Sequence, residues 1–265
     1  MTISSELPAE VTVSKPKADK EGIIRYEIKS SFEIKPLVLR IIEPKKFSKK
    51  DLSDKCKFLF VLPVESRNNY CFGDGLKFVA ATNLHNELDL ILVAPEFYGI
   101  PWYCDHPADG LKDESFLVKA LVPLLDKIYP ARKVSRLLLG FSKSGWGALS
   151  LILRNPDVFT AAVAWDSPLM ETTPINYGMK DAFGTQGNFN KYQITTLFKE
   201  KADIFRKKKR VALFGYCDFG DQMEQAHKIL LDLGIPHDWN NSTVRDHRFG
   251  SGWEKEAILS LNKMS

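Results

Sequence analysis

The 265-residue chain has little of what marks several large classes of protein. It holds only four cysteines, none of them in a C-x-x-C pair, so neither a zinc-ligand set nor a dense disulfide framework is expected. No apolar run approaches the ~18 residues of a membrane span. The first residues lack the apolar stretch of a secretory signal. We therefore expect no membrane association, a cytoplasmic location and reduced thiols.

The charges are also close to balance. There are 37 basic and 33 acidic residues, which give a formal net charge of +4. The basic run at residues 207–210 adjoins an expected strand and has no aromatic residues among it, so nucleic acid is not an expected partner. Phosphate-loop, EF-hand and His-x-x-Glu-His stretches are missing as well, so we expect neither a metal nor an organic cofactor.

What the chain does have is a regular alternation of two patterns. Short, continuous apolar runs are typical of strands covered on both faces, as in parallel sheets. Such runs are separated by amphipathic or apolar helical stretches, and two earlier segments alternate like an antiparallel pair. We expect the antiparallel pair at 22–29 and 36–42, buried strands at 58–64, 88–94, 134–140, 160–165 and 211–216, and helices at 116–128, 146–153, 221–233 and 252–264. The sequence thus predicts an α/β fold with a doubly wound, mostly parallel sheet.

The pattern fits a single domain. Residues 1–20 are polar and are expected to form a flexible lead-in to a domain over residues 21–265. Residues 167–209 carry scattered proline, glycine and asparagine and show no strong period. Because they lie between two core strands, we expect an irregular insertion that forms a pocket wall or a lid.

The most informative stretch is GFSKSGWG, which holds Ser142 between an apolar strand and an apolar helix. This is the context of a nucleophile elbow, whose strained backbone needs small neighbours. Gly140 stands two residues before the serine, but Ser144 replaces the usual glycine two residues after it. The amide of Lys143 begins the helix, where it can stabilise an oxyanion. A serine-rich helix start without chemistry is the alternative interpretation.

A serine nucleophile needs a base, and the base needs an acid that orients it, in the chain order Ser, Asp, His. Asp218 follows the strand at 211–216 and is the predicted acid, whereas Asp221 is predicted to cap the next helix. Asp166 also follows a strand and is the fallback acid or a pocket-wall residue. His247 lies in a glycine-rich loop before the last helix and is the predicted base.

The other histidines have simpler interpretations. His85, His227 and His237 are expected at surface or edge positions without a catalytic role. His106 follows the strand at 88–94 and competes for the role of base, or else lines the pocket.

The remaining candidates concern the oxyanion hole and the pocket. The loop after the strand at 58–64 should supply a second donor, and we predict the amide of Glu65. The negative charge of its carboxylate would repel an oxyanion unless the side chain points away or pairs with Arg67. Trp102 and Tyr103 lie in an aromatic-rich loop, where they either stack on a sugar or aryl group of a substrate or pack in the core.

These motifs resemble a known family. GFSKSGWGALSLILRNPDVF resembles the GxSxGGxGAxxxAxxxPxxF stretch of the putative-esterase branch of α/β-hydrolases, which includes S-formylglutathione hydrolase, feruloyl and acetylxylan esterases and mycolyltransferases. ESFLVKALVPLLDKIYP is similar to the family's helix before the nucleophile strand, and GYCDFGDQMEQAHKILLDLGIPHDW to its acid strand and the helix after it. DHRFGSGW resembles the histidine loop, in which the family commonly pairs the histidine with a tryptophan, here Trp253.

The resemblance covers residues 55–263 and implies an α/β-hydrolase fold. By it, the nucleophile, acid and base are Ser142, Asp218 and His247, and the amides of Glu65 and Lys143 form the oxyanion hole. The expected function is hydrolysis of a small-molecule carboxylic ester through an acyl-serine intermediate. The alternatives are an acyltransferase on the same triad and a catalytically silent binding module. The acyl and alcohol parts of the substrate and the oligomeric state stay open.

Overall fold

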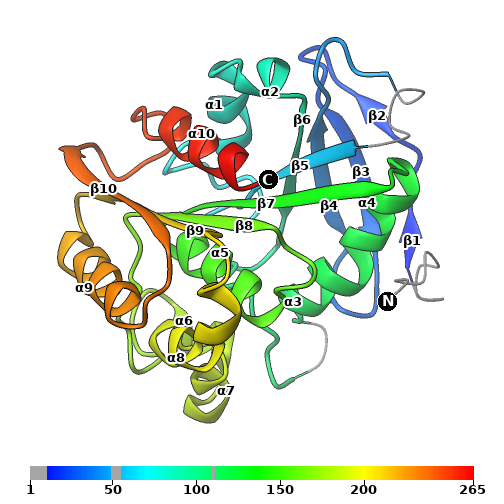
Figure 1. Ribbon diagram of the computed structural model, residues 1–265. Helices are drawn as coiled ribbons and strands as arrows, with labels where there is room; N and C mark the ends of the chain where they lie inside the picture. The colour runs from blue at the N-terminus through cyan, green and yellow to red at the C-terminus, as the bar shows by residue number, and fades with distance from the viewer. Residues whose placement is uncertain (1–10, 49–54, 109–110) are drawn as a thin grey trace.

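The structure is a computed structural model that describes residues 11–48, 55–108 and 111–265. Within these ranges the chain forms one ten-stranded sheet in the order β1-β3-β4-β6-β5-β7-β8-β9-β10, with β2 paired to β3 beside this path (Figure 1). The predicted doubly wound sheet is therefore confirmed, and it runs through the centre of the molecule with helices on both faces.

The two parts of the sheet differ in strand direction. β3 (Ile24–Lys29) and β4 (Leu37–Ile42) are antiparallel, as predicted, and β4 joins the rest of the sheet by pairing antiparallel with β6. Six strands on the other side of β4 pair in parallel with one another. They are β5 (Lys55–Val61), β6 (Leu90–Glu96), β7 (Lys133–Phe141), β8 (Ala161–Trp165), β9 (Val211–Tyr216) and β10 (His237–Val244). Parallel strands end at the same edge of a sheet, and that edge is where the site residues are found.

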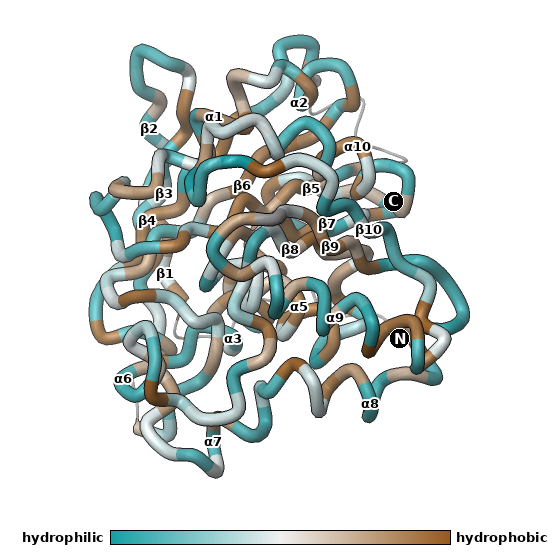
Figure 2. Tube along the Cα trace, turned by 90° about the vertical axis from the view of Figure 1, so that its left-hand side faces the viewer, coloured by the Kyte–Doolittle hydropathy of each residue, from teal (hydrophilic) through white to brown (hydrophobic). Residues whose placement is uncertain are grey.

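Alternate residues of each central strand belong to different halves of the core. Phe58 and Phe60 of β5 lie in one buried cluster, whereas Leu59 and Val61 lie in the other. This period of two follows from the pleat of a strand and explains why the runs are apolar throughout. Figure 2 shows the hydrophobic segments gathered around the sheet, with hydrophilic loops toward the outside.

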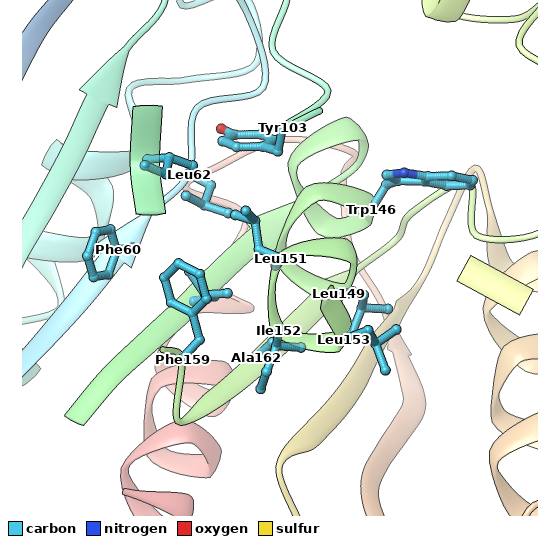
Figure 3. Close-up of a cluster of buried hydrophobic side chains, with 14 of the residues drawn as sticks. Phe60, Leu62, Tyr103, Trp146, Leu149, Leu151, Ile152, Leu153, Phe159 and Ala162 are labelled. Carbon is cyan, nitrogen blue, oxygen red and sulfur yellow. The ribbon is translucent and has the colours of Figure 1, made fainter. Parts of the chain in front are cut away.

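Helices cover both clusters. One face carries α1 (Gly75–Ala81), α2 (Leu84–Glu87) and α10 (Glu254–Met264), whose apolar residues belong to the cluster that includes Leu59. The other face carries α3 (Asp113–Phe116), α4 (Val122–Ile128), α5 (Lys143–Arg154) and α9 (Gly220–Asp232). Helix α8 (Ile194–Phe205) contacts α5 and α9. Figure 3 shows the side chains of α5 packed among those of β5, β8 and the loop that holds Tyr103.

The predicted helix at 116–128 contains a wider turn. A π-helical segment, η2 (Leu117–Leu121), joins α3 to α4, and Pro123 lies in the first turn of α4. Proline has no amide hydrogen and cannot complete the helical hydrogen-bond ladder, so a local change of helical pitch accompanies it. The predicted helix is therefore interrupted by a π-helical turn next to Pro123.

Two segments are more ordered than the sequence predicted. Among the described residues of the expected lead-in, β1 (Thr12–Val13) and β2 (Lys17–Ala18) pair antiparallel with β3, while residues 1–10 lie outside the description. The segment at 167–209 contains α6 (Met179–Phe183), α7 (Gln186–Asn190) and α8. It folds because buried aromatic rings such as Phe183 pack against α5, an interaction that local periodicity does not reveal.

No helix in the described ranges combines the length and apolar character that crossing a bilayer requires.

A pair of carboxyl groups joins the connection between β3 and β4, which carries Glu33, to the first residue of α3, Asp113. Glu33 and Asp113 hydrogen bond with each other, and Asp105 adds a negative charge nearby. Burial, followed by the charge of Asp113, raises the pKa of Glu33 to about 9, and burial raises the pKa of Asp113 to about 7. Because these values exceed those of the unfolded chain, the pair favours folding at low pH, and this contribution is lost as the pH rises toward 9.

We therefore predict that Glu33→Gln removes part of the loss of stability at alkaline pH. The variant keeps the size of the side chain but cannot acquire the buried charge. At pH 8 to 9 its midpoint of thermal unfolding should exceed that of the wild type by about 2–4 °C, and the difference should shrink at pH 5. Circular dichroism melts across this range measure it, with Glu27→Gln on the exposed side of β3 as the control. An equal effect of both substitutions would contradict the assignment.

Candidate active site

Ser142 lies between the end of β7 and the start of α5, in a backbone conformation that residues other than glycine rarely adopt. Its φ is 52° and its ψ is −126°. The turn is so tight that a Cβ on Gly140 would lie 2.0 Å from the carbonyl oxygen of Ser144. Such a strained turn on a nucleophilic residue projects its side chain away from the sheet edge. The strand-turn-helix context predicted for Ser142 is therefore present.

The serine at position 144 has a clear local explanation. Its hydroxyl donates to the carbonyl oxygen of Phe141 at 2.9 Å and accepts from the amide of the same residue at 3.0 Å. The side chain is fully buried and faces the strand end. On the other side of the turn, the hydroxyl of Ser167 donates to the carbonyl of Ser142 at 2.7 Å. Ser144 thus replaces glycine without crowding the nucleophile and adds hydrogen bonds to the turn.

The loop between β10 and α10 brings His247 to Ser142. The Nε2 atom of His247 lies 3.1 Å from the Oγ of Ser142. Its Nδ1 atom lies 2.5 Å from the Oδ2 of Asp166, the residue directly after β8. The three side chains therefore form a continuous line of hydrogen bonds along the carboxyl ends of β7 and β8.

The carboxylate of Asp166 is fully buried and has several hydrogen-bond partners. It accepts hydrogen bonds from the amides of Phe219 at 2.9 Å and Asp218 at 3.1 Å, in addition to its contact with His247. A buried carboxylate needs such partners to remain charged. When Nδ1 of His247 donates to this carboxylate, the lone pair of Nε2 faces Ser142.

Asp218, the predicted acid, occupies a different position. Its side chain is 63% exposed, and its nearest carboxylate oxygen is 3.9 Å from Nδ1 of His247. The loop after β9 reaches the predicted edge of the sheet. There the backbone amide of Asp218, and not its side chain, binds Asp166. The residue that hydrogen bonds the histidine is thus the fallback acid. In the sequence, the only feature that made Asp166 a candidate acid is its position after a buried strand, and Asp218 has the same feature.

Aromatic rings surround the imidazole of His247. The ring centroids of Phe141, Phe219 and Phe72 lie 4.5, 5.5 and 5.8 Å from that of the histidine. Trp253 does not appear among these contacts. It stacks on Trp165 at 5.1 Å with the rings parallel to within 2°, and Trp165 in turn stacks on His247 at 6.2 Å. The tryptophan of the histidine loop therefore supports the ring of His247 through a second tryptophan.

Glu254 holds the histidine loop in shape. Its side chain is 2% exposed, and it accepts hydrogen bonds from the amides of Gly250 and Gly252, the latter at 3.1 Å. Both glycines have positive φ values, 85° and 97°, which a side chain would strain. The sequence analysis did not identify Glu254, because a glutamate in the first turn of a helix is ordinary.

The two predicted oxyanion residues lie beside the nucleophile, and their side chains are paired. A carboxylate oxygen of Glu65 accepts a hydrogen bond from the Nζ of Lys143. The carboxylate is therefore paired with Lys143, whereas Arg67 donates to the hydroxyl of Tyr98 at 2.7 Å. Because Lys143 is the first residue of α5, its amide has no acceptor within the helix.

Trp102 and Tyr103, named as candidate pocket residues, are both fully buried. Trp102 packs edge-on against Trp146 at 6.0 Å, and the hydroxyl of Tyr103 donates to the carbonyl of Pro63 at 2.6 Å. Gly147 leaves the space that the ring of Tyr103 fills, since a Cβ there would lie 2.0 Å from that ring. The structure thus supports the alternative in which these rings pack in the core.

The other histidines lie apart from the hydrogen-bonded line. His106 lines a groove whose residues include neither Ser142 nor His247, and its Nδ1 accepts from the amide of Ala108 at 2.9 Å. His227 and His237 contact each other at 2.8 Å. His85 lies in α2 and is buried, not at the surface or edge position that was expected. Asp221 does not cap α9. Phe219 is the N-cap, and Asp221 lies in the first turn, where its charge suits the helix dipole.

Glu254 generates a prediction about the histidine loop. In Glu254→Ala, two glycine amides lose their acceptor and the loop that carries His247 loosens. A misplacement of about 1 Å can cost about 10²-fold in rate, so we expect a loss of that order in the reaction of Ser142 with a fluorophosphonate. Labelling rates measure it. Glu256→Ala, on the exposed side of the same helix turn, is the control. Equal labelling rates for the two variants would contradict the role of Glu254.

Comparisons with known proteins bear on the family and the fold. Residues 103–230 match the model of the family described as Putative esterase. The fold resembles an S-formylglutathione hydrolase from Agrobacterium tumefaciens, with a TM-score of 0.72, 13% identity and coverage of 96% of this chain and 99% of that chain. It also resembles a ferulic acid esterase (TM-score 0.65, 17% identity, 96% and 97% covered). A fluorophosphonate-binding serine hydrolase from Staphylococcus aureus is a third similar structure (TM-score 0.64, 14% identity, 96% and 97% covered).

No curated protein matches the chain by sequence. At 13–17% identity the structural matches establish the fold, and the family model supplies the link to a function. Together they support a carboxylic ester hydrolase. The predicted resemblance is thus confirmed: residues 103–230 match the model of the putative-esterase family, and the fold is the α/β-hydrolase fold of the similar solved esterases.

Proposed function

We propose that this protein hydrolyses a small-molecule carboxylic ester with Ser142 as nucleophile, His247 as base and Asp166 as the acid that orients the base. The observation that carries the proposal is the line of contacts from Ser142 Oγ to His247 Nε2, at 3.1 Å, and from His247 Nδ1 to Asp166, at 2.5 Å. A hydroxyl, an imidazole and a buried carboxylate in this order form the arrangement that activates a serine.

The reaction proceeds in two halves. Nε2 of His247 accepts the hydroxyl proton as Ser142 Oγ bonds to the ester carbonyl carbon, and the carbonyl oxygen becomes an oxyanion facing the amides of Glu65 and Lys143. The oxyanion collapses and the alcohol leaves with the proton held by His247, so an acyl-serine remains. Water then loses a proton to His247 and attacks the acyl carbon. The serine regains its proton, and the carboxylic acid departs.

The insertion at 167–209 forms one wall of the substrate site in this proposal. Tyr177, which lies on the insertion and is half exposed, contacts the ring of Phe219 at 5.5 Å. Phe219 in turn contacts His247 at the same centroid distance. An aromatic path thus leads from the base to the surface and favours substrates with an apolar group on that side.

The nucleophile assignment predicts the behaviour of Ser142→Ala. Removal of the hydroxyl eliminates the acyl-serine intermediate, so turnover of a p-nitrophenyl ester should fall by about 10⁴-fold or more. Steady-state kinetics with purified protein measure it, and Ser144→Ala, whose hydroxyl faces the strand end, is the matched control. Full turnover in Ser142→Ala would move the nucleophile elsewhere. Absence of turnover and of fluorophosphonate labelling in the wild type would favour a silent binding module.

A second prediction separates the two aspartates. Asp166→Asn should lower kcat by about 10⁴-fold, because an amide no longer holds the proton of His247 on Nδ1. Asp218→Asn keeps the backbone amide that supports Asp166, so its kcat should change by less than about tenfold. The two kcat values, measured at pH 7 to 8 with the same ester, decide the assignment. A large loss in Asp218→Asn with little loss in Asp166→Asn would restore Asp218 as the acid.

A further inference from the structure

The ion pair between Lys143 and Glu65 joins the two residues whose amides face the proposed oxyanion. The pair links the loop after β5 to the first turn of α5. Its side chains are 12% and 10% exposed, so water screens them little. Breaking such a pair by removal of one partner leaves a poorly solvated charge, which is unfavourable.

The loop that carries Glu65 has few other attachments close to this residue. On one side, the amide of Leu62 donates to the carbonyl of Leu139 at 3.0 Å, and the carbonyl of Pro63 accepts from the hydroxyl of Tyr103 at 2.6 Å. On the other, the amide of Arg67 donates to the carbonyl of Phe97 at 2.6 Å. Among the described parts of the chain, the amide of Glu65 itself donates no hydrogen bond to another residue. The contact with Lys143 is therefore what ties Glu65 directly to the nucleophile helix.

The charges of the pair also affect the proposed oxyanion. A carboxylate beside a developing oxyanion would repel it, and the ammonium group of Lys143 cancels this charge. A glycine or another small residue in place of Glu65 would avoid the problem, but it would also lose the attachment to α5. The pair thus combines a fixed loop with a neutral environment for the oxyanion.

We infer that Lys143 and Glu65 act through their side chains as a positioning pair, which fixes the two oxyanion-hole amides relative to each other and neutralises the carboxylate next to them. The inference rests on the proposed function, since it assumes that an oxyanion forms at Ser142. The side chains contact each other and not the reacting atoms, so the pair affects the transition state through the two amides.

The test is a set of four variants assayed with a p-nitrophenyl ester. Loss of one oxyanion donor costs about 10²–10³-fold, so a misplaced donor in Lys143→Met should lower kcat by about 10- to 100-fold, with KM changed less than about threefold. Glu65→Gln should lower kcat by a smaller factor, because it removes the repelling charge together with the anchor. Lys143→Glu should be worst, since two carboxylates then face each other. Adding Glu65→Lys to Lys143→Glu reverses the pair and should restore kcat by about tenfold or more over Lys143→Glu alone.

Lys228→Met is the matched control, because it removes the lysine of an exposed ion pair with Glu224 on α9. It should leave kcat unchanged. Thermal unfolding of every variant identifies those that fail to fold, and the nearly isosteric Glu65→Gln keeps the test open if a charge-reversed variant does not fold. Unchanged kcat in Lys143→Met, or no recovery in the reversed pair when it is folded, would overturn the inference.

The turnover of Ser142→Ala separates failure of this inference from failure of the proposed function. If Ser142→Ala abolishes turnover and Lys143→Met retains it, only the positioning pair is wrong. If Ser142→Ala retains turnover, the proposed function itself is wrong.

Discussion

The left-handed backbone of Ser142 is the constraint on which the arrangement of the site depends. Such a conformation costs about 1–3 kcal/mol for a residue with a side chain, so the surrounding structure must hold it. Buried strand β7 fixes one side and buried helix α5 the other. Gly140 permits the close approach of the two, and the hydroxyls of Ser144 and Ser167 bind the backbone of the turn. The strain places the nucleophile at the sheet edge and the first amide of α5 beside it.

Parallel strands supply the rest of the site by ending at one edge. Strand β8 delivers Asp166, and the loop after β9 delivers the amides of Asp218 and Phe219 that bind its carboxylate. Burial of that carboxylate would be unfavourable without these donors and without His247. The two amides and His247 thus all contact the carboxylate of Asp166 and hold it in place beside the imidazole.

Much of this architecture could be predicted from the sequence. Continuous apolar runs identified the central strands, and the GFSKSGWG turn identified Ser142, because both depend on local composition. The choice between Asp166 and Asp218 could not be made in this way. Both residues follow parallel strands, and the direction of each side chain depends on the turn that carries it and on what buries it.

The other differences have related causes. Trp102 and Tyr103 occupy the core because Trp146 and Gly147 of α5 shape a space for them, a three-dimensional fit that loop composition does not reveal. The helices at 167–209 form through packing of aromatic rings against α5, where periodicity is weak. The pairing of Glu65 with Lys143 joins residues far apart in the chain, and their nearness follows only from the topology of β5 and β7.

The central claim is that Ser142, His247 and Asp166 form the reacting line, with an oxyanion facing the amides of Glu65 and Lys143. A crystal structure of the protein after reaction with a fluorophosphonate tests it most directly, because the adduct resembles the tetrahedral intermediate. The account predicts a phosphorus bonded to Ser142 Oγ, a phosphonyl oxygen within hydrogen-bond distance of both amides, and Nδ1 of His247 still on Asp166. A phosphorus bonded to another residue, or an imidazole that has turned to Asp218, would contradict it.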